Sequence, residues 1–163
     1  MRLRRPARLT AALAVVLIGV VAGAPSAPAT AASRAGSCPA GARGQITAAY
    51  NAVFDRGALT PAPDRAARLA DSSDPGLRSI LDTWLLDTRG GNTTATINHI
   101  RCTRANRAAV DFDLILAGTP LPGVLPLGQA VRQQGVWKVA KSTFCARVIL
   151  ENPSLATTGA CSG

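Results

Sequence analysis

His99 is the only histidine of the chain, and it is the first candidate for acid–base chemistry because an imidazole titrates near neutral pH. It lies in a run of β-branched and aliphatic residues, Thr93 to Thr103. A second run, Ala109 to Ala117, carries Asp111 and Asp113 in alternation with apolar residues, which predicts a half-buried strand. Antiparallel pairing of the two runs would bring the imidazole opposite a carboxylate.

The length of the turn between these runs decides what His99 faces. With an odd number of unpaired residues, His99 faces Asp113, while Ile100 and Cys102 lie on the core face. With an even number, His99 joins Phe112 on the core side, and both carboxylates lie opposite apolar residues. We favour the first register because it separates charge from core. The exposed His99–Asp113 pair would contribute on the order of a few tenths of a kcal/mol, so a catalytic His99 is not expected.

The residues predict no other catalytic or cofactor site. Asp111 and Asp113 are about 6 to 7 Å apart on one strand face, but neither is predicted to be buried, so they do not predict a glycosidase pair. No Gly-x-Ser-x-Gly elbow is present to support a Ser–His–Asp triad. A single histidine and the lack of a Cys-x-x-Cys pair argue against a metal site.

The four cysteines form an even set, which predicts disulfides in an oxidising compartment. Cys145 and Cys161 bracket the last predicted helix and the tail, so we favour this pair, with Cys38 joined to Cys102. The rival pairing joins Cys102 to Cys145 and Cys38 to Cys161. The sequence alone leaves both open.

Residues 1–31 predict a signal peptide. Four arginines precede an uncharged apolar run from Leu9 to Ala24, and small residues then supply Ala-x-Ala cleavage sites ending at Ala29 and Ala31. The apolar run is too short for a comfortable membrane span, and no basic flank follows it, so no stable span is expected after cleavage. We therefore expect a secreted protein, extracellular or in the cell envelope.

The formal charge of +9 includes these signal arginines, which leaves 14 of the 18 basic residues against 9 acidic ones, or +5, for the mature domain. The remaining charges are spread out, and no run of Lys or Arg follows the signal, so nucleic acid is not an expected partner. Roughly 130 residues remain after cleavage, which is enough for one domain with its own hydrophobic core.

Apolar periodicity predicts a lead-in at residues 32–44, a single α+β domain at 45–155, and a tail at 156–163 held by Cys161. The predicted order is three helices, four antiparallel strands and a short helix, near residues 46–54, 60–70, 77–85, 93–103, 109–117, 129–133, 136–141 and 142–150. We therefore expect N-terminal helices packed on a curved four-stranded sheet, with Tyr50, Trp84 and Trp137 in the core.

The loop from Thr119 to Leu127 is apolar, although three prolines and a glycine keep it from regular structure. It either folds over the core of its own domain or forms a contact patch for a ligand or partner. The residues concerned are Leu121, Val124, Leu125 and Leu127.

The segment Gly135-Val-Trp-Lys-Val-Ala-Lys-Ser-Thr-Phe-Cys145 resembles the end of the secreted low-molecular-weight antigen family of mycobacteria and related actinobacteria. The order of the preceding elements agrees, and the resemblance covers about residues 45–155. It implies a cystatin-like or nuclear-transport-factor-2-like cone, in which the sheet wraps around a long helix. The family is known chiefly as secreted antigens, and the resemblance brings no catalytic residues with it.

We expect a secreted, non-enzymatic protein that binds a small apolar ligand or a cell-envelope partner through the apolar loop, with Tyr50 reaching the cone interior. The alternative is an enzyme that uses this interior, as some nuclear-transport-factor-2-like folds do. Such an enzyme would draw on Tyr50, His99, Asp113 and Asp82.

Overall fold

A computed structural model describes residues 37–57, 60–86, 92–125, 127–157 and 159–162. These residues belong to one unit of the chain, Ala32–Gly163. The predicted signal peptide and the start of the predicted lead-in lie outside the described residues.

Three helices form where the apolar stripes predict them. α1 (Ala42–Phe54) begins slightly before its predicted stripe, after a turn in which Gly41 has a φ of 74°. α2 (Ala62–Ala67) is short, and α3 (Pro75–Leu86) begins where the Asp74 carboxylate accepts a hydrogen bond from the Gly76 N–H at 2.8 Å. The buried stripes are Ile46, Ala49, Tyr50, Val53 and Phe54 of α1, and Leu77, Ile80, Leu81 and Trp84 of α3.

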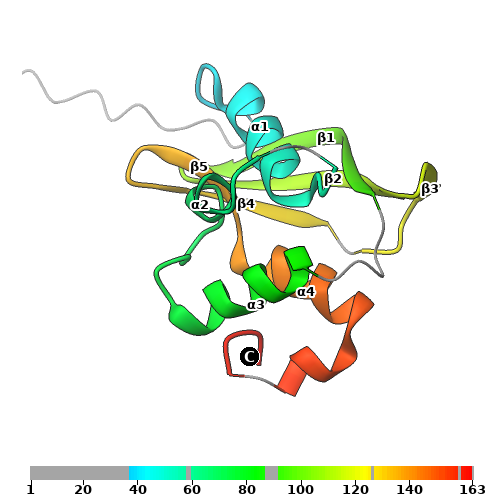
Figure 1. Ribbon diagram of the computed structural model, residues 1–163. Coiled ribbons are helices and arrows are strands. Elements are labelled where there is room, and N and C mark those ends of the chain that lie inside the picture. The colour runs from blue at the N-terminus through cyan, green and yellow to red at the C-terminus, as the bar shows by residue number, and fades with distance from the viewer. Residues whose placement is uncertain (1–36, 58–59, 87–91, 126, 158, 163) are drawn as a thin grey trace, which may run out of the picture. The chain divides into compact units, whose positions relative to one another are not determined.

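The strands form an antiparallel sheet in the order β1-β2-β4-β5 (Figure 1). They are β1 (Thr93–Arg104), β2 (Arg107–Leu116), β4 (Gly128–Gln133) and β5 (Val136–Val139). A fifth strand, β3 (Thr119–Leu121), pairs with the end of β2 inside the apolar loop. Pro120 has no N–H for the ladder, which explains why the sequence did not predict this strand. The α+β class is confirmed, with five strands in place of the expected four.

A β-bulge at Asn98 sets which residues of β1 face the core. Before the bulge, odd-numbered residues such as Thr93 and Ile97 face inward, and after it the even-numbered Ile100 and Cys102 do so. The bulge therefore adds one unpaired residue to β1, which reverses the alternation of inward-facing and outward-facing side chains along the strand. Hydrophobic alternation alone does not predict this shift.

The predicted separation of charge from core is confirmed, but the predicted partner of His99 is wrong. His99 lies opposite Asp111, and Asp113 lies opposite Thr96. The tight turn at Ala105–Asn106 lies closer to β1 than expected, which moves the partner of His99 by two residues and leaves His99 and Asp111 on the same face of the sheet.

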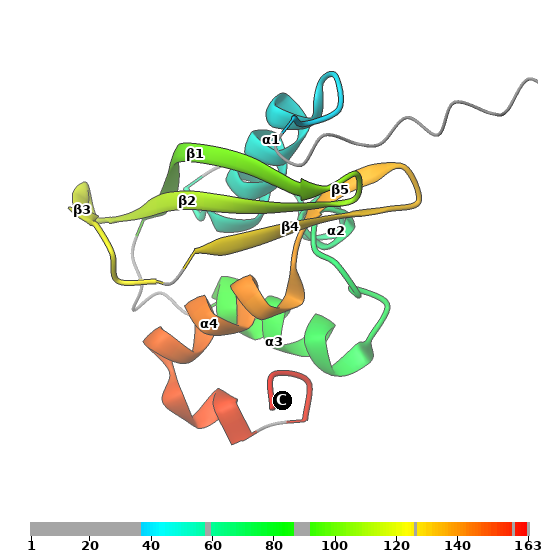
Figure 2. The same ribbon diagram turned by 180° about the vertical axis from the view of Figure 1, so that it is seen from behind.

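Other segments cover the edges of β5 and β4. Leu69 forms a parallel bridge with Val139 at the outer edge of β5. Beyond the end of β5, α4 (Lys141–Glu151) lies beside β4, where the Ala140 N–H donates to the Gln129 carbonyl at 2.9 Å. In Figures 1 and 2, α3 and α4 lie side by side next to β4, whereas α1 lies next to β1 and β5.

Two aromatic groups fill the core. Tyr50 and Phe54 of α1 pack against Phe112 of β2, with ring centroids 5.1 and 5.7 Å from its ring. Trp84 of α3 packs against Phe144 of α4 at 5.7 Å. Each such pair contributes about 0.5–1.5 kcal/mol beyond the area that it buries. Both tryptophans and the tyrosine lie in the core, as expected from the sequence.

Two disulfides fasten the ends of the domain, in the pairing that the sequence favoured. Cys38 is joined to Cys102 of β1, with 5.0 Å between the Cα atoms. Cys145 of α4 is joined to Cys161, beyond the 3₁₀ helix η2 (Pro153–Thr157), with 5.4 Å between the Cα atoms. The described residues contain no free cysteine.

A polar cluster joins α3 to α4. Glu151 accepts hydrogen bonds from Arg147 in the same helix and from the indole N–H of Trp84 in α3. Arg147 is only 2% exposed, and the Arg56 guanidinium carbon lies 5.1 Å from the centroid of the Trp84 ring. Because a buried charge is costly without a partner, these contacts fix how the two helices pack.

Candidate functional site

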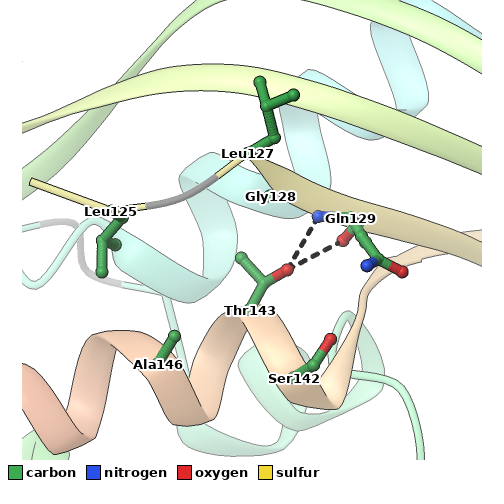
Figure 3. A pocket seen from close by; sticks show the side chains of 7 residues that line it. All are labelled: Leu125, Leu127, Gly128, Gln129, Ser142, Thr143 and Ala146. Atoms are coloured by element: carbon green, nitrogen blue, oxygen red, sulfur yellow. Dashed lines mark hydrogen bonds between the residues drawn. The ribbon is translucent and has the colours of Figure 1, made fainter. Parts of the chain in front are cut away.

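A pocket of about 190 Å³ lies between the apolar loop and α4 (Figure 3). The loop contributes two leucines, β4 contributes its first residues, and α4 contributes its first turns. The lining residues are Leu125, Leu127, Gly128, Gln129, Ser142, Thr143 and Ala146. The fold thus brings the apolar loop, which ends at Leu127, against α4, which begins at Lys141, a contact that the sequence did not predict.

The two leucines of this pocket have different environments. Leu125 is half-buried and packs against the core. Leu127 is 62% exposed, and its side chain points away from α4 in Figure 3. One part of the loop therefore packs on the domain, and another part presents an apolar side chain to solvent.

The other two apolar residues of the loop do not line this pocket. Leu121 is half-buried in β3, opposite Leu114 of β2. Val124 is 42% exposed. With Leu127, Val124 adds to the apolar surface of the loop.

The floor of the pocket is held by hydrogen bonds around Gln129. The Thr143 hydroxyl accepts from the Gln129 N–H at 2.8 Å and donates to the Gln129 carbonyl at 3.3 Å. The Tyr50 hydroxyl donates to the same carbonyl at 3.1 Å. Burial raises the pKa of Tyr50 far above its ordinary value, more than its hydrogen bond with Thr143 lowers it, so this hydroxyl stays protonated.

Tyr50 itself lies in the core and has no exposed surface. The layer between α1 and the sheet is filled at this point, because a Cβ atom on Gly128 would lie 2.7 Å from Cε1 of Phe112 and would also meet the Tyr50 hydroxyl oxygen. The pocket therefore lies outside this layer, and Tyr50 supports its floor from below.

The ionisable groups considered for an enzyme lie on separate elements. His99 is exposed on β1, and Asp113 on β2 accepts a hydrogen bond from the Asn98 side chain at 2.9 Å. Asp82 lies on α3 and pairs with Arg78 at 3.7 Å. Among the residues that the structure describes, no group of three or more His, Cys, Asp or Glu side chains is placed to hold a metal ion.

Two further hollows adjoin the pocket, and sequence reasoning missed both. One, of about 590 Å³, is lined by Thr103, Arg104, Arg107, Ala108, Ala109, Leu127, Gly128 and Gln129. The other, of about 350 Å³, is lined by Ala70, Asp71, Asn106, Arg107, Gln129, Val131, Arg132, Gln133, Ala140, Lys141 and Ser142. Small side chains beside arginines at the β1–β2 turn are the only sequence signal for them.

The family model for the C-terminal domain of the low molecular weight antigen MTB12 matches residues 39–154. The chain belongs to this family. No curated protein and no solved structure matches the chain. The matched range of the antigen domain contains the pocket and both aromatic groups, in agreement with the resemblance seen in the sequence.

Each disulfide connects the MTB12-type domain to a residue outside the matched range. Cys102 and Cys145 lie within residues 39–154, whereas Cys38 and Cys161 lie just before and just after them. Both disulfides and the family fit an extracellular protein. No helix in the described ranges is long and apolar enough to cross a membrane.

Proposed function

We propose that this protein is a secreted, non-enzymatic binding protein whose contact site is the pocket between the apolar loop and α4. Its predicted signal peptide, its two disulfides and its membership of an antigen family support an extracellular role. The partner is an apolar ligand or a component of the cell envelope.

The exposed Leu127 beside this pocket carries the proposal. A single exposed leucine is ordinary on a protein surface. Here, however, the leucine stands at the rim of a hollow that the half-buried Leu125 also lines, and hydrogen bonds hold the floor of this hollow in place. Such a combination of a fixed polar floor and apolar walls is typical of binding sites.

The size of the pocket limits what it holds. At about 190 Å³ it is smaller than the range of about 300–1,000 Å³ that is usual for sites holding a whole small molecule. The pocket therefore accepts one apolar group of a larger partner, such as a branched side chain or part of an acyl chain. The remainder of that partner would lie over neighbouring surface.

Native mass spectrometry of the protein from the culture medium of its host tests this function. We expect a chain cut after Ala29 or Ala31, four hydrogens lighter than its reduced form, that carries additional non-covalent mass. We expect the Leu127→Ser variant to lose this mass, and the Leu150→Ser variant, altered at a leucine on α4 that is 48% exposed, to keep it. Retention of the wild-type protein in the cytoplasm contradicts the proposal. Secretion of a wild-type chain that carries no additional mass also contradicts it.

A further inference from the structure

The pocket and the two adjoining hollows form one continuous surface around a single residue. Gln129 lines all three. Leu127 and Gly128 line both the pocket and the larger hollow, and Arg107 lines both hollows. The pocket and the two hollows therefore border one another along these residues.

The larger hollow contains two arginines that repel each other. Arg104 and Arg107 lie opposite each other where β1 turns into β2, and both are exposed. Like charges directly opposite each other on a sheet are destabilising. Within the described ranges, neither guanidinium has an ion pair or a hydrogen-bond partner. An anion placed between them would relieve the repulsion.

The other charged groups at these hollows already have partners. Lys141 pairs with Asp74 at 3.7 Å, and the Arg132 side chain donates to the Gly135 carbonyl at 3.1 Å. The carboxylate of Asp71 accepts a hydrogen bond from the Gln133 amide at 2.9 Å. Arg104 and Arg107 are therefore the cationic part of the larger hollow, whereas Arg132 and Lys141 line the smaller one.

Leu127 connects the cationic part to the apolar part. It lines the pocket together with Leu125, and it lines the larger hollow together with Arg104 and Arg107. At about 590 Å³, this hollow has the size of an ordinary ligand site. The small side chain of Ala109 leaves its space open.

We propose that this surface binds a lipid with an anionic head group. The head group lies between Arg104 and Arg107, whose guanidinium groups match phosphate and carboxylate oxygens, and the first part of the acyl chain passes Leu127 into the pocket beside Leu125. This inference rests on the proposed function, because it names the class of partner for the same site. A polyanion would use only the arginines, and an apolar protein partner would use only the leucines.

The test uses the mature, disulfide-bonded chain and short-chain lipids that remain monomeric in solution. The probes are dihexanoyl phosphatidylglycerol, the zwitterionic dihexanoyl phosphatidylcholine, and inorganic phosphate, measured by isothermal titration calorimetry at low and high salt. We expect the anionic lipid to bind best, phosphate alone to bind weakly, and added salt to lower the affinity.

Two variants and a charge-matched control locate the binding. We expect the Arg104→Gln/Arg107→Gln double variant and the Leu127→Ser variant each to lower the affinity for phosphatidylglycerol by about tenfold. The Arg43→Gln/Arg78→Gln variant removes the same charge from α1 and α3, and we expect it to bind as the wild type does. Circular dichroism establishes that each variant is folded.

Four outcomes overturn the proposal. Equal binding of both lipids, weakened only by Leu127→Ser, shows an apolar site without head-group recognition. Binding of phosphate as strong as that of the anionic lipid, weakened only by the arginine variant, shows an anion site alone. No lipid binding, with a partner retained in the native mass spectra, removes this inference and leaves the proposed function. No lipid binding and no retained partner removes both.

Discussion

The hydroxyl of Thr143 forms two hydrogen bonds with the backbone of Gln129, one from its N–H at 2.8 Å and one to its carbonyl at 3.3 Å. β5 ends at Val139 and α4 begins at Lys141, so no strand continues beside Gln129 at this edge of β4. The Thr143 hydroxyl takes the place of that strand as the hydrogen-bond partner of the Gln129 backbone. A side chain of α4 thus completes the hydrogen bonding of the sheet at the floor of the pocket.

Replacing this hydroxyl is expected to destabilise the domain. Thr143→Val keeps the shape of the buried side chain but leaves the Gln129 N–H without its partner, at a cost of about 1–3 kcal/mol. Urea denaturation followed by circular dichroism measures the change in free energy of unfolding. Thr143→Ser retains the hydroxyl and is expected to lose less. A Thr143→Val variant as stable as the wild type would show that these hydrogen bonds do not stabilise this edge.

Gly128→Ala is expected to destabilise the protein because the new methyl group would overlap Phe112 and the Tyr50 hydroxyl oxygen. Overpacking of this kind costs about 1–3 kcal/mol. The control is Gly44→Ala in α1, where a Cβ has nothing within 4 Å and the exchange should stabilise the helix by about 0.5–1 kcal/mol. Adding Tyr50→Phe to the Gly128→Ala variant should restore part of the melting temperature. A Gly128→Ala variant as stable as the wild type would contradict this packing.

The two disulfides are expected to differ in what they contribute. Cys38–Cys102 closes a loop with a sequence separation of 64, and Cys145–Cys161 closes one with a separation of 16. Loop-closure entropy assigns about 4 kcal/mol to the longer loop and about 3 kcal/mol to the shorter one. Guanidinium denaturation of the two Cys-to-Ser double variants measures both. Peptide mapping without reduction is the control for connectivity, and a Cys38–Cys145 peptide would disprove this arrangement.

Glu151→Ala is expected to lower the stability by about 3–5 kcal/mol. It removes the ion-pair partner of Arg147, whose side chain is 3% exposed, and the hydrogen-bond acceptor of the Trp84 indole N–H. Asp82→Asn is the matched control, because it breaks the exposed pair with Arg78 and should cost at most about 1 kcal/mol. Thermal unfolding followed by tryptophan fluorescence reports on both variants. Similar small losses would mean that the cluster contributes little to the packing of α3 on α4.

The apolar loop is expected to divide into a structural part and a contact part. Leu121→Ser/Leu125→Ser removes two half-buried side chains and should lower the free energy of unfolding by about 1–3 kcal/mol. Leu127→Ser should change it by no more than about 0.5 kcal/mol, because this side chain is 62% exposed. Urea denaturation of both variants tests the division. A stable double variant that lost binding would instead make the whole loop a contact patch.

Much of this fold could be predicted from the sequence because its local signals agree with its packing. The stripe around Tyr50 and the capping signal at Asp74 predict α1 and α3. The turn Gln134-Gly135 predicts the β4–β5 hairpin, and both residues have positive φ there, 51° and 80°.

Other features depend on contacts between distant segments, and the sequence did not predict them. The bulge at Asn98 changes the face of β1 without a change in composition. The surface around Gln129 forms only when the apolar loop, the β1–β2 turn and α4 meet, and no single segment carries its pattern. A search for motifs in one stretch of chain could find the leucines of this site but not the arginines that lie beside them.

The bridge between Leu69 and Val139 affects how readily the protein aggregates at high concentration. Exposed strand edges are templates on which a second chain can add a strand and begin to aggregate. Here the bridge occupies the outer edge of β5, and Thr143 occupies the open edge of β4. Among the described residues, the long edge that remains is that of β1, where the bulge at Asn98 interrupts regular pairing. Because one edge of the sheet is covered, copies of this chain cannot add to one another edge to edge in an open-ended series.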